Sequence, residues 1–152
     1  MIKHIKGDAV ELLKLGLVDG LVHCCNAQGV MGAGIAAQIK KEFPATYEYY
    51  NKCVNDNIKT YDGDSSRLLG DIYPCVGVIN LIGQVQTGTH KRQVNYGAIA
   101  VGLQRIVGFI NSSHTKYSRE RPYKLALPKG MGCGLAGGDW DKLTVYIVDF
   151  QQ

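Results

Sequence analysis

Two glycine-rich segments of this sequence have the composition that binds a phosphate through backbone amides. Each follows an apolar run typical of a buried strand, the first segment spanning residues 25–34 and the second residues 130–138. Glycine lacks a Cβ atom, so consecutive N–H groups can converge on one anion, and a helix that begins in the first segment would add its dipole. The two segments together predict a diphosphate that is held from both sides.

The second segment also contains the GxGxxG pattern of dinucleotide-binding Rossmann domains, at residues 132–137. In those domains the pattern opens a helix, and a further strand and an acidic residue follow within about 20 positions. Only 15 residues follow Gly137, which is too few for these elements. The chain also lacks the P-loop pattern, in which Gly-Lys precedes Ser or Thr. The sequence therefore predicts neither of these nucleotide-binding folds.

Cysteine and histidine side chains are the other candidates for chemistry. His23, Cys24 and Cys25 are consecutive in an apolar run. Because adjacent strand residues point to opposite faces, we expect structural cysteines there and no metal site. Cys133 lies among the backbone amides of the second segment, which favour a thiolate nucleophile, but the sequence identifies no histidine partner for it.

The composition is that of one globular domain over residues 1–152. Hydrophobic residues make up 45% of the chain, and no apolar stretch approaches the roughly 18 residues of a membrane helix. The five cysteines are odd in number and form no CxxC pair, which predicts reduced thiols and a cytoplasmic protein. The net charge of +4 comes from dispersed basic residues, which indicate either a solvated surface or attraction to a polyanion.

Hydrophobic spacing predicts the elements that position the glycine segments. Leu21–Cys25 indicates a strand buried on both faces. Ile35, Ile39 and Phe43 recur at four-residue spacing, which predicts a helix over 34–43 that stops at Pro44. The other expected elements are helices over 10–15, 46–54 and 94–111, strands over 2–6, 71–76, 78–82, 123–127 and 144–150 with a tight hairpin at Gly77, and loops over 55–69 and 84–93.

The alternation of strands and helices predicts an α/β fold with a largely parallel sheet between helical layers. Both glycine segments follow strands. Ligands of open α/β sheets bind in the crevice beyond the carboxyl ends of the strands, so we expect the two segments to meet there.

Four blocks of the sequence together resemble a macrodomain. They are Gly7 with Asp8, residues 21–36, residues 80–84 with Tyr96, and residues 127–140. These blocks are similar to the small single-domain branch that includes the ADP-ribose-1''-phosphate phosphatases and the terminal ADP-ribose glycohydrolase that acts on glutamate. The resemblance implies a three-layer α/β/α sandwich with a mostly parallel mixed central sheet. It also implies a monomer that binds ADP-ribose or a derivative, with no cofactor and no metal.

The resemblance assigns a role to residues in each block. Asp8 would accept a hydrogen bond from the adenine amino group, the amide of Ala9 would contact the base, and Asn26 would hold the distal ribose. The amides of Gly32, Ala33, Gly34 and Ile35 would bind one phosphate, and the second segment, Met131, Gly132, Cys133, Gly134, Leu135 and Ala136, would close over the diphosphate and ribose. Asp8 as a helix cap and Asn26 as a turn residue are the structural alternatives.

The resemblance makes His23, Asn26 and Asp139 the candidate catalytic residues. His23 is expected at the strand end beside the distal ribose, where it could position or protonate a 1''-phosphate; a hydrogen-bonded core histidine is the alternative. The glutamate-specific enzyme has a lysine nucleophile and an aspartate where this chain has Gln84 and Ala136. Neither residue can do that chemistry, and Asp139 is the carboxylate that remains nearby. The segment 140–144 is also too short for the helix usual there.

The function expected from these residues is hydrolysis at the distal ribose, converting ADP-ribose-1''-phosphate to ADP-ribose and phosphate. A water held by Asn26, His23 or a substrate phosphate would attack, with most of the rate coming from positioning and oriented amides. The alternatives are a mono-ADP-ribosyl hydrolase and a non-catalytic reader of ADP-ribosylated protein or nucleic acid. A further alternative is an RNA-binding protein, suggested by residues 90–92, His-Lys-Arg.

Overall fold

The computed structural model describes residues 2–87, 94–117, 121–128 and 144–150. The strands form a six-stranded sheet in the order β1-β6-β5-β2-β4-β3. The elements in chain order are β1 (Ile2–Lys6), α1 (Ala9–Lys14), β2 (Gly20–Asn26), α2 (Gly34–Glu42), α3 (Pro44–Thr60), the 3-10 helix η1 (Ser65–Leu68), β3 (Ile72–Cys75), β4 (Val78–Gln84), α4 (Tyr96–Tyr117), β5 (Tyr123–Pro128) and β6 (Thr144–Phe150).

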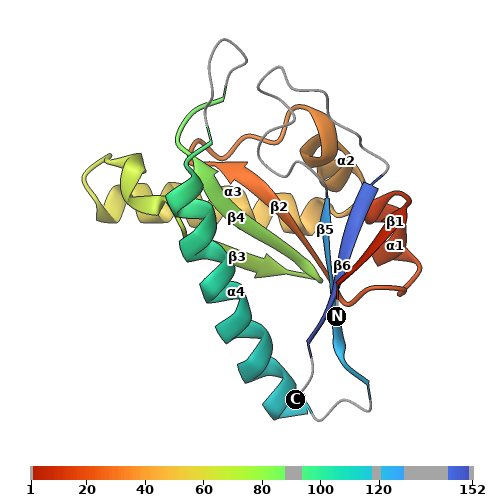
Figure 1. Cartoon of the computed structure of the whole chain (residues 1–152). Coiled ribbons are helices and arrows are strands. Elements are labelled where there is room, and N and C mark those ends of the chain that lie inside the picture. Colours follow the sequence, from red (N-terminus) through yellow and green to blue (C-terminus); the bar gives the residue numbers. More distant parts are fainter. Residues whose placement is uncertain (1, 88–93, 118–120, 129–143, 151–152) are drawn as a thin grey trace.

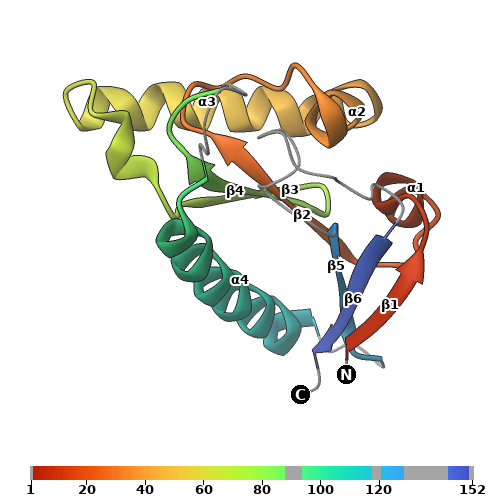
Figure 2. The ribbon, with the colours of Figure 1, turned by 45° about the horizontal axis from the view of Figure 1, so that its top comes forward.

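Helices cover both faces of the sheet, which confirms the expected three-layer α/β/α sandwich (Figure 1). Figure 2 shows α1, α2 and α3 on one face and α4 on the other. Alternate residues of β2 divide between two cores. Leu21 and Cys25 pack with Tyr50 of α3, whereas Val22 packs with Ile106 of α4. β2 is therefore buried on both faces, as its apolar run predicted.

The sheet is mixed, and its parallel pairs lie at the centre. β2 pairs in parallel with both β4 and β5, while β1–β6, β5–β6 and β3–β4 are antiparallel. These pairings make β1, β2, β4 and β5 run in one direction and β3 and β6 in the other. The carboxyl ends of β2, β4 and β5 consequently meet at one edge, which is where the sequence predicted a ligand site.

The hairpin between β3 and β4 forms at the predicted position. Val76 and Gly77 both have a positive φ, 50° and 83°. Two successive residues in this region make the type I′ turn, whose twist suits a two-residue hairpin. Thr46 of α3 donates from its hydroxyl to the carbonyl of Cys75 at 3.1 Å, which ties the hairpin to the helical layer.

The helix α3 is longer than predicted. It was expected to end at Val54, with a loop over 55–69, but it continues to Thr60, and η1 forms within the expected loop. The polar composition of this stretch was misleading, because Lys52 and Asp56 form an i,i+4 ion pair at 2.7 Å and Ile58 still packs on the core. Side-chain pairs of this kind stabilise a helix that has few apolar residues.

The helix α4 begins and ends later than predicted. Asn95 accepts a hydrogen bond from the amide of Ala98 at 2.9 Å, so Asn95 caps the helix and Val94 lies outside it. The helix then continues beyond Asn111 to Tyr117. Neither α4 nor any other helix in the described ranges is both long and apolar enough to cross a membrane.

Two glycines allow α4 to approach β4 closely. A Cβ atom on Gly102 of α4 would lie 2.5 Å from Cγ of Leu81, and one on Gly83 of β4 would lie 2.5 Å from Cδ1 of Ile99. Real Cβ atoms do not approach carbon this closely, so a side chain at either position would force the neighbouring side chains to shift. This contact positions the start of α4 beside the carboxyl end of β4.

Candidate functional site

The first glycine segment joins the carboxyl end of β2 to the start of α2 (Figure 1). Gly32, Ala33 and Gly34 are exposed, and Gly34 has a φ of 58°. Ala33 is the N-cap residue and has no side chain that could accept a hydrogen bond from the helix. The amide of Ala37 bonds to the carbonyl of Ala33 at 3.3 Å. The amides before it, from Gly34 onward, have no intrahelical acceptor.

This arrangement suits an anion for two reasons. The uncapped N–H groups carry the positive end of the helix dipole, and the exposed backbone lets a ligand approach them. Gly32 is open as well, since a Cβ atom there would meet only Cγ1 of Val30, at 3.8 Å. The structure therefore brings together the four positions expected to bind a phosphate: Gly32, Ala33, Gly34 and Ile35.

Asp8 lies beside this segment and performs two structural tasks. Its Oδ1 accepts hydrogen bonds from the amides of Val10 at 2.9 Å and Glu11 at 3.2 Å, so it caps α1. Its Oδ2 accepts a hydrogen bond from Nε2 of Gln38, on α2, at 2.9 Å. The capping alternative is thus confirmed, and the expected contact of the exposed carboxylate with an adenine remains a prediction. Gln38 was missed, because nothing in its sequence context links it to a residue 30 positions away.

The side chain of Asn26 forms hydrogen bonds within the turn that follows it. Its Oδ1 accepts hydrogen bonds from the amides of Gln28 at 3.0 Å and Val30 at 3.3 Å, and its Nδ2 donates to the carbonyl of Val30 at 2.8 Å. The Tyr50 hydroxyl lies 2.9 Å from the same Oδ1. The side chain is buried, so the structural alternative for Asn26 is confirmed and its Oδ1 is already occupied. The expected contact of Asn26 with the distal ribose remains a prediction.

His23 is a core residue, and its expected place at the strand end beside a ligand is wrong. It lies three residues before the end of β2 and is only 1% exposed. Its Nε2 is 2.7 Å from Oδ1 of Asn80, its partner in the parallel ladder with β4. Burial lowers the pKa of His23 to about 4, so the imidazole is neutral at pH 7. A buried neutral ring cannot protonate a bound phosphate.

Cys25, His23 and Asn80 have the composition of a Cys-His-Asn protease triad but not its geometry. Cys25 Sγ lies closer to Nε2 of His23, at 3.3 Å, than to Nδ1, at 3.8 Å, and Asn80 Oδ1 lies 2.7 Å from the same Nε2. A catalytic triad needs the nucleophile and the orienting residue on opposite nitrogens. Burial also raises the pKa of the Cys25 thiol, so it is not a thiolate. This cluster is a structural one.

Gln84 ends β4 directly opposite Asn26. Its carbonyl accepts the amide of Ala27 at 3.0 Å, and its Nε2 donates to the carbonyl of Gln86 at 2.9 Å. An amide side chain in this position has neither the basicity nor the nucleophilicity of an amine. The structure therefore places Gln84 at the site but gives it no covalent chemistry.

Several predicted residues lie outside the described ranges. They are the second glycine segment with Met131, Gly132, Cys133, Gly134, Leu135 and Ala136, the carboxylate of Asp139, and the basic residues 90–92. Their assigned roles remain predictions. Within the part of the chain that the structure describes, no three histidine, cysteine or acidic side chains converge as a metal site would require.

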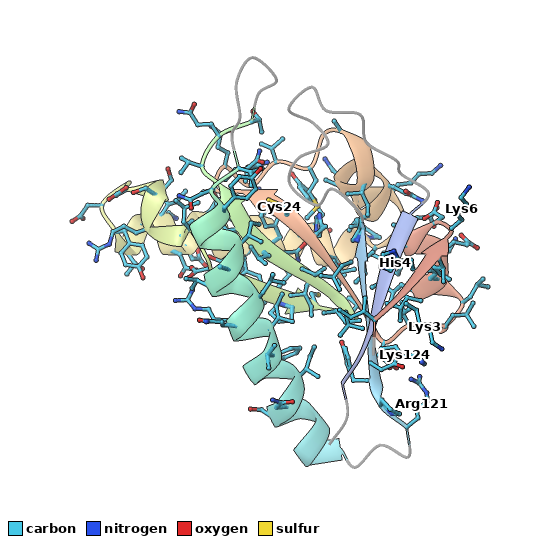
Figure 3. All side chains as sticks on the ribbon, in the orientation of Figure 1. Lys3, His4, Lys6, Cys24, Arg121 and Lys124 are labelled. Atoms are coloured by element: carbon cyan, nitrogen blue, oxygen red, sulfur yellow. The ribbon has the colours of Figure 1, made fainter. Side chains whose placement is uncertain are left out.

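The basic residues Lys3, Lys6, Arg121 and Lys124 lie along β1 and at the start of β5 (Figure 3). Two of them are paired with carboxylates. Arg121 makes a bidentate pair with Asp19, at 2.7 and 2.8 Å, and Lys124 contacts Asp149 at 2.9 Å. Such pairs reduce the attraction of this surface for a polyanion, which favours the solvated-surface interpretation of these charges.

The structure has the α/β/α layers that the resemblance to a macrodomain implied, and two of the sequence blocks that carried the resemblance form the open α2 N-terminus and the cap at Asp8. The family model of the Macro domain matches residues 22–147, which include both glycine segments. The chain belongs to the Macro domain family. Its membership confirms the resemblance and the fold that the sequence predicted.

Individual relatives of this macrodomain differ in how much of the chain they match. An ADP-ribose 1''-phosphate phosphatase of Meyerozyma guilliermondii is 39% identical over 47% of this chain, and the match spans only 38% of that relative. An uncharacterised 17.5 kDa protein of Enterobacteria phage T4 is 27% identical and matches 99% of this chain and 97% of its own. The structure of Thermosipho africanus DarTG in complex with ADP-ribose superposes with a TM-score of 0.57 at 21% identity. It covers 81% of this chain and 32% of that one.

Proposed function

We propose that this macrodomain binds ADP-ribose and hydrolyses ADP-ribose-1''-phosphate to ADP-ribose and phosphate. The observation that carries the proposal is the exposed, uncapped start of α2 at Gly32–Ile35, next to the carboxylate of Asp8. This pairing supplies donors for a diphosphate and an acceptor for the adenine amino group. The relatives named as ADP-ribose 1''-phosphate phosphatases support the same substrate.

Binding would exchange one existing contact for a ligand contact. The Oδ1 atom of Asp8 stays on the amides of α1, and Oδ2 releases Nε2 of Gln38 to accept from adenine. The diphosphate then lies over the α2 amides, with the second segment, Met131–Ala136, closing from the other side. Because the distal ribose contacts both segments in this arrangement, ADP-ribose should bind more tightly than ADP.

The described residues determine which chemistry is available. The Oδ1 atom of Asn26 is occupied by its turn, His23 is buried and neutral, and Gln84 is an amide. Hydrolysis would therefore rest on oriented backbone amides and a positioned water, with Asp139 as the candidate base. The water oxygen bonds to phosphorus, the bond from phosphorus to the ribosyl oxygen breaks, and a proton passes to that oxygen.

A reader of ADP-ribosylated protein or nucleic acid is the second candidate. It is favoured by the described residues nearest the expected ribose, since His23 is buried and neutral and Gln84 is an amide. The exposed carboxylate of Asp8 is assigned to the adenine and not to the bond that would break. Incubation with ADP-ribose-1''-phosphate separates the two candidates: the phosphatase releases orthophosphate and ADP-ribose in equal amounts. A reader leaves the compound intact while still binding ADP-ribose. ADP-ribosylated glutamate, assayed in parallel, tests the mono-ADP-ribosyl hydrolase alternative.

We further propose that the protein acts as a monomer in the cytoplasm. The cytoplasmic location rests on the cysteine usage, which lacks a CxxC pair and is odd in number. Light scattering at several concentrations tests the monomer, since a mass that rises with concentration would contradict it.

A further inference from the structure

Two adjacent residues of α3 contact the first glycine segment from behind. The hydroxyl of Tyr50 lies 2.6 Å from the carbonyl oxygen of Asn26 and 2.9 Å from its Oδ1. Nδ2 of Asn51 donates to the carbonyl of Gly29 at 3.0 Å. Tyr50 is fully buried, so its hydroxyl cannot touch a ligand directly.

These contacts control the shape of the turn. Oδ1 of Asn26, next to the Tyr50 hydroxyl, is the atom that accepts the amides of Gln28 and Val30. Gly29 has a φ of 77°, and a Cβ atom there would lie 2.9 Å from Nδ2 of Asn51. Tyr50 thus fixes the side chain around which the turn folds, and Asn51 holds the backbone at the left-handed glycine.

We infer that Tyr50 and Asn51 are positioning residues that place the first glycine segment for ligand binding. This inference rests on the proposed function for the identity of the ligand. Burial raises the pKa of Tyr50, so its hydroxyl stays protonated and can donate at any physiological pH. A turn held from behind in this way is preorganised, and the ligand does not have to order it on binding.

The other end of α3 offers matched controls. Tyr73 is also buried, and its hydroxyl donates to Asp71 at 2.9 Å and accepts from Asn57 of α3 at 3.1 Å. Tyr73→Phe and Asn57→Ala therefore remove the same chemical groups as Tyr50→Phe and Asn51→Ala. Their contacts are with β3 and its flank, away from the glycine segment.

The experiment measures dissociation constants for ADP-ribose and AMP in these four variants, together with amide hydrogen exchange. Tyr50→Phe should weaken ADP-ribose about five- to tenfold, the effect of losing one hydrogen bond, and leave AMP nearly unchanged if AMP is held mainly at its adenine end. Asn51→Ala should also weaken ADP-ribose binding. Both variants should accelerate amide hydrogen exchange at Gln28 and Val30. The two control variants should leave both the affinity and the exchange at these amides as in the wild type.

Equal ADP-ribose affinity in Tyr50→Phe, Asn51→Ala and the controls would overturn the inference while leaving the proposed function intact. If the wild type binds no ADP-ribose, the proposed function fails, and hydrogen exchange alone decides the positioning role. Unchanged exchange at Gln28 and Val30 in Tyr50→Phe then contradicts it. A variant that loses its fold is replaced by its partner, since Tyr50→Phe and Asn51→Ala test the same segment.

Discussion

His23 Nε2 lies 2.7 Å from Asn80 Oδ1, across the parallel ladder that joins β2 to β4. Asn80 donates from Nδ2 to the carbonyl of Tyr73 at 2.9 Å, so its oxygen is the acceptor and His23 is the donor. This chain of hydrogen bonds links β2, β4 and β3 beneath α3. The histidine that the sequence singled out for catalysis therefore stabilises the middle of the sheet.

The first prediction is a loss of stability in mild acid. The pKa of His23 is about 4 in the folded protein and about 6.5 when unfolded, so the unfolded state binds more protons between these values. The free energy of unfolding should fall by up to about 3 kcal/mol as the pH drops from 6.5 to 4. Urea titrations at several pH values measure this. His23→Gln should make the free energy of unfolding less dependent on pH. An equally steep pH profile in that variant would show that other groups cause the loss of stability.

A second prediction separates the two roles of Asp8. Asparagine is as good an N-cap as aspartate, but its amide nitrogen cannot accept a hydrogen bond. Asp8→Asn should change the free energy of unfolding by less than about 0.5 kcal/mol and weaken ADP-ribose by roughly 1.5 to 3 kcal/mol. Asp8→Ala should lose both the stability that the cap provides and the affinity for ADP-ribose. If Asp8→Asn binds ADP-ribose like the wild type, Asp8 is a cap only.

The close packing of α4 on β4 gives a third prediction. Gly102→Ala should destabilise the protein by about 1 to 3 kcal/mol, because its methyl group would collide with Leu81. Gly108 lies on the same helix with nothing within 4 Å of an added Cβ. Gly108→Ala should stabilise the helix by about 0.5 to 1 kcal/mol. Thermal unfolding of the two variants measures these changes. Equal melting temperatures would contradict the close contact between Gly102 and Leu81.

Hydrophobic patterns predicted the elements that depend on local sequence. The spacing of Ile35 and Ile39 predicted the apolar face of α2, and Gly77 predicted the position of the hairpin between β3 and β4. The end of α3 was missed, because the Lys52–Asp56 pair stabilises the helix through side chains that also suit a loop.

Contacts between distant segments could not be predicted from local patterns. The bond between His23 and Asn80 depends on the register of β2 against β4, which neither strand encodes alone. The contact of Tyr50 with Asn26 depends on the packing of α3 against the sheet, which the sequence of the helix does not show. For this reason the glycine segment was located from sequence, whereas its supporting residues were not.

A fourth prediction tests the location of the phosphate. Gly32→Glu should fold normally, because the position is open and its φ is not in the left-handed region, whereas Gly34→Glu is also strained by a φ of 58°. The new carboxylate would oppose the diphosphate, at a cost of about 1 to 4 kcal/mol for charges about 4 Å apart. We expect ADP-ribose affinity to fall about 100-fold. Gly108→Glu adds the same charge on exposed α4 and should leave the affinity unchanged.

Calorimetric titration of the wild-type chain with ADP-ribose, ADP and AMP tests the central claim most directly. If Asp8 binds the adenine, the first glycine segment binds the diphosphate and both glycine segments contact the distal ribose, ADP-ribose should bind at one site and at least about tenfold more tightly than ADP. ADP should in turn bind more tightly than AMP. Equal dissociation constants for the three compounds, or no heat of binding with ADP-ribose, would contradict it.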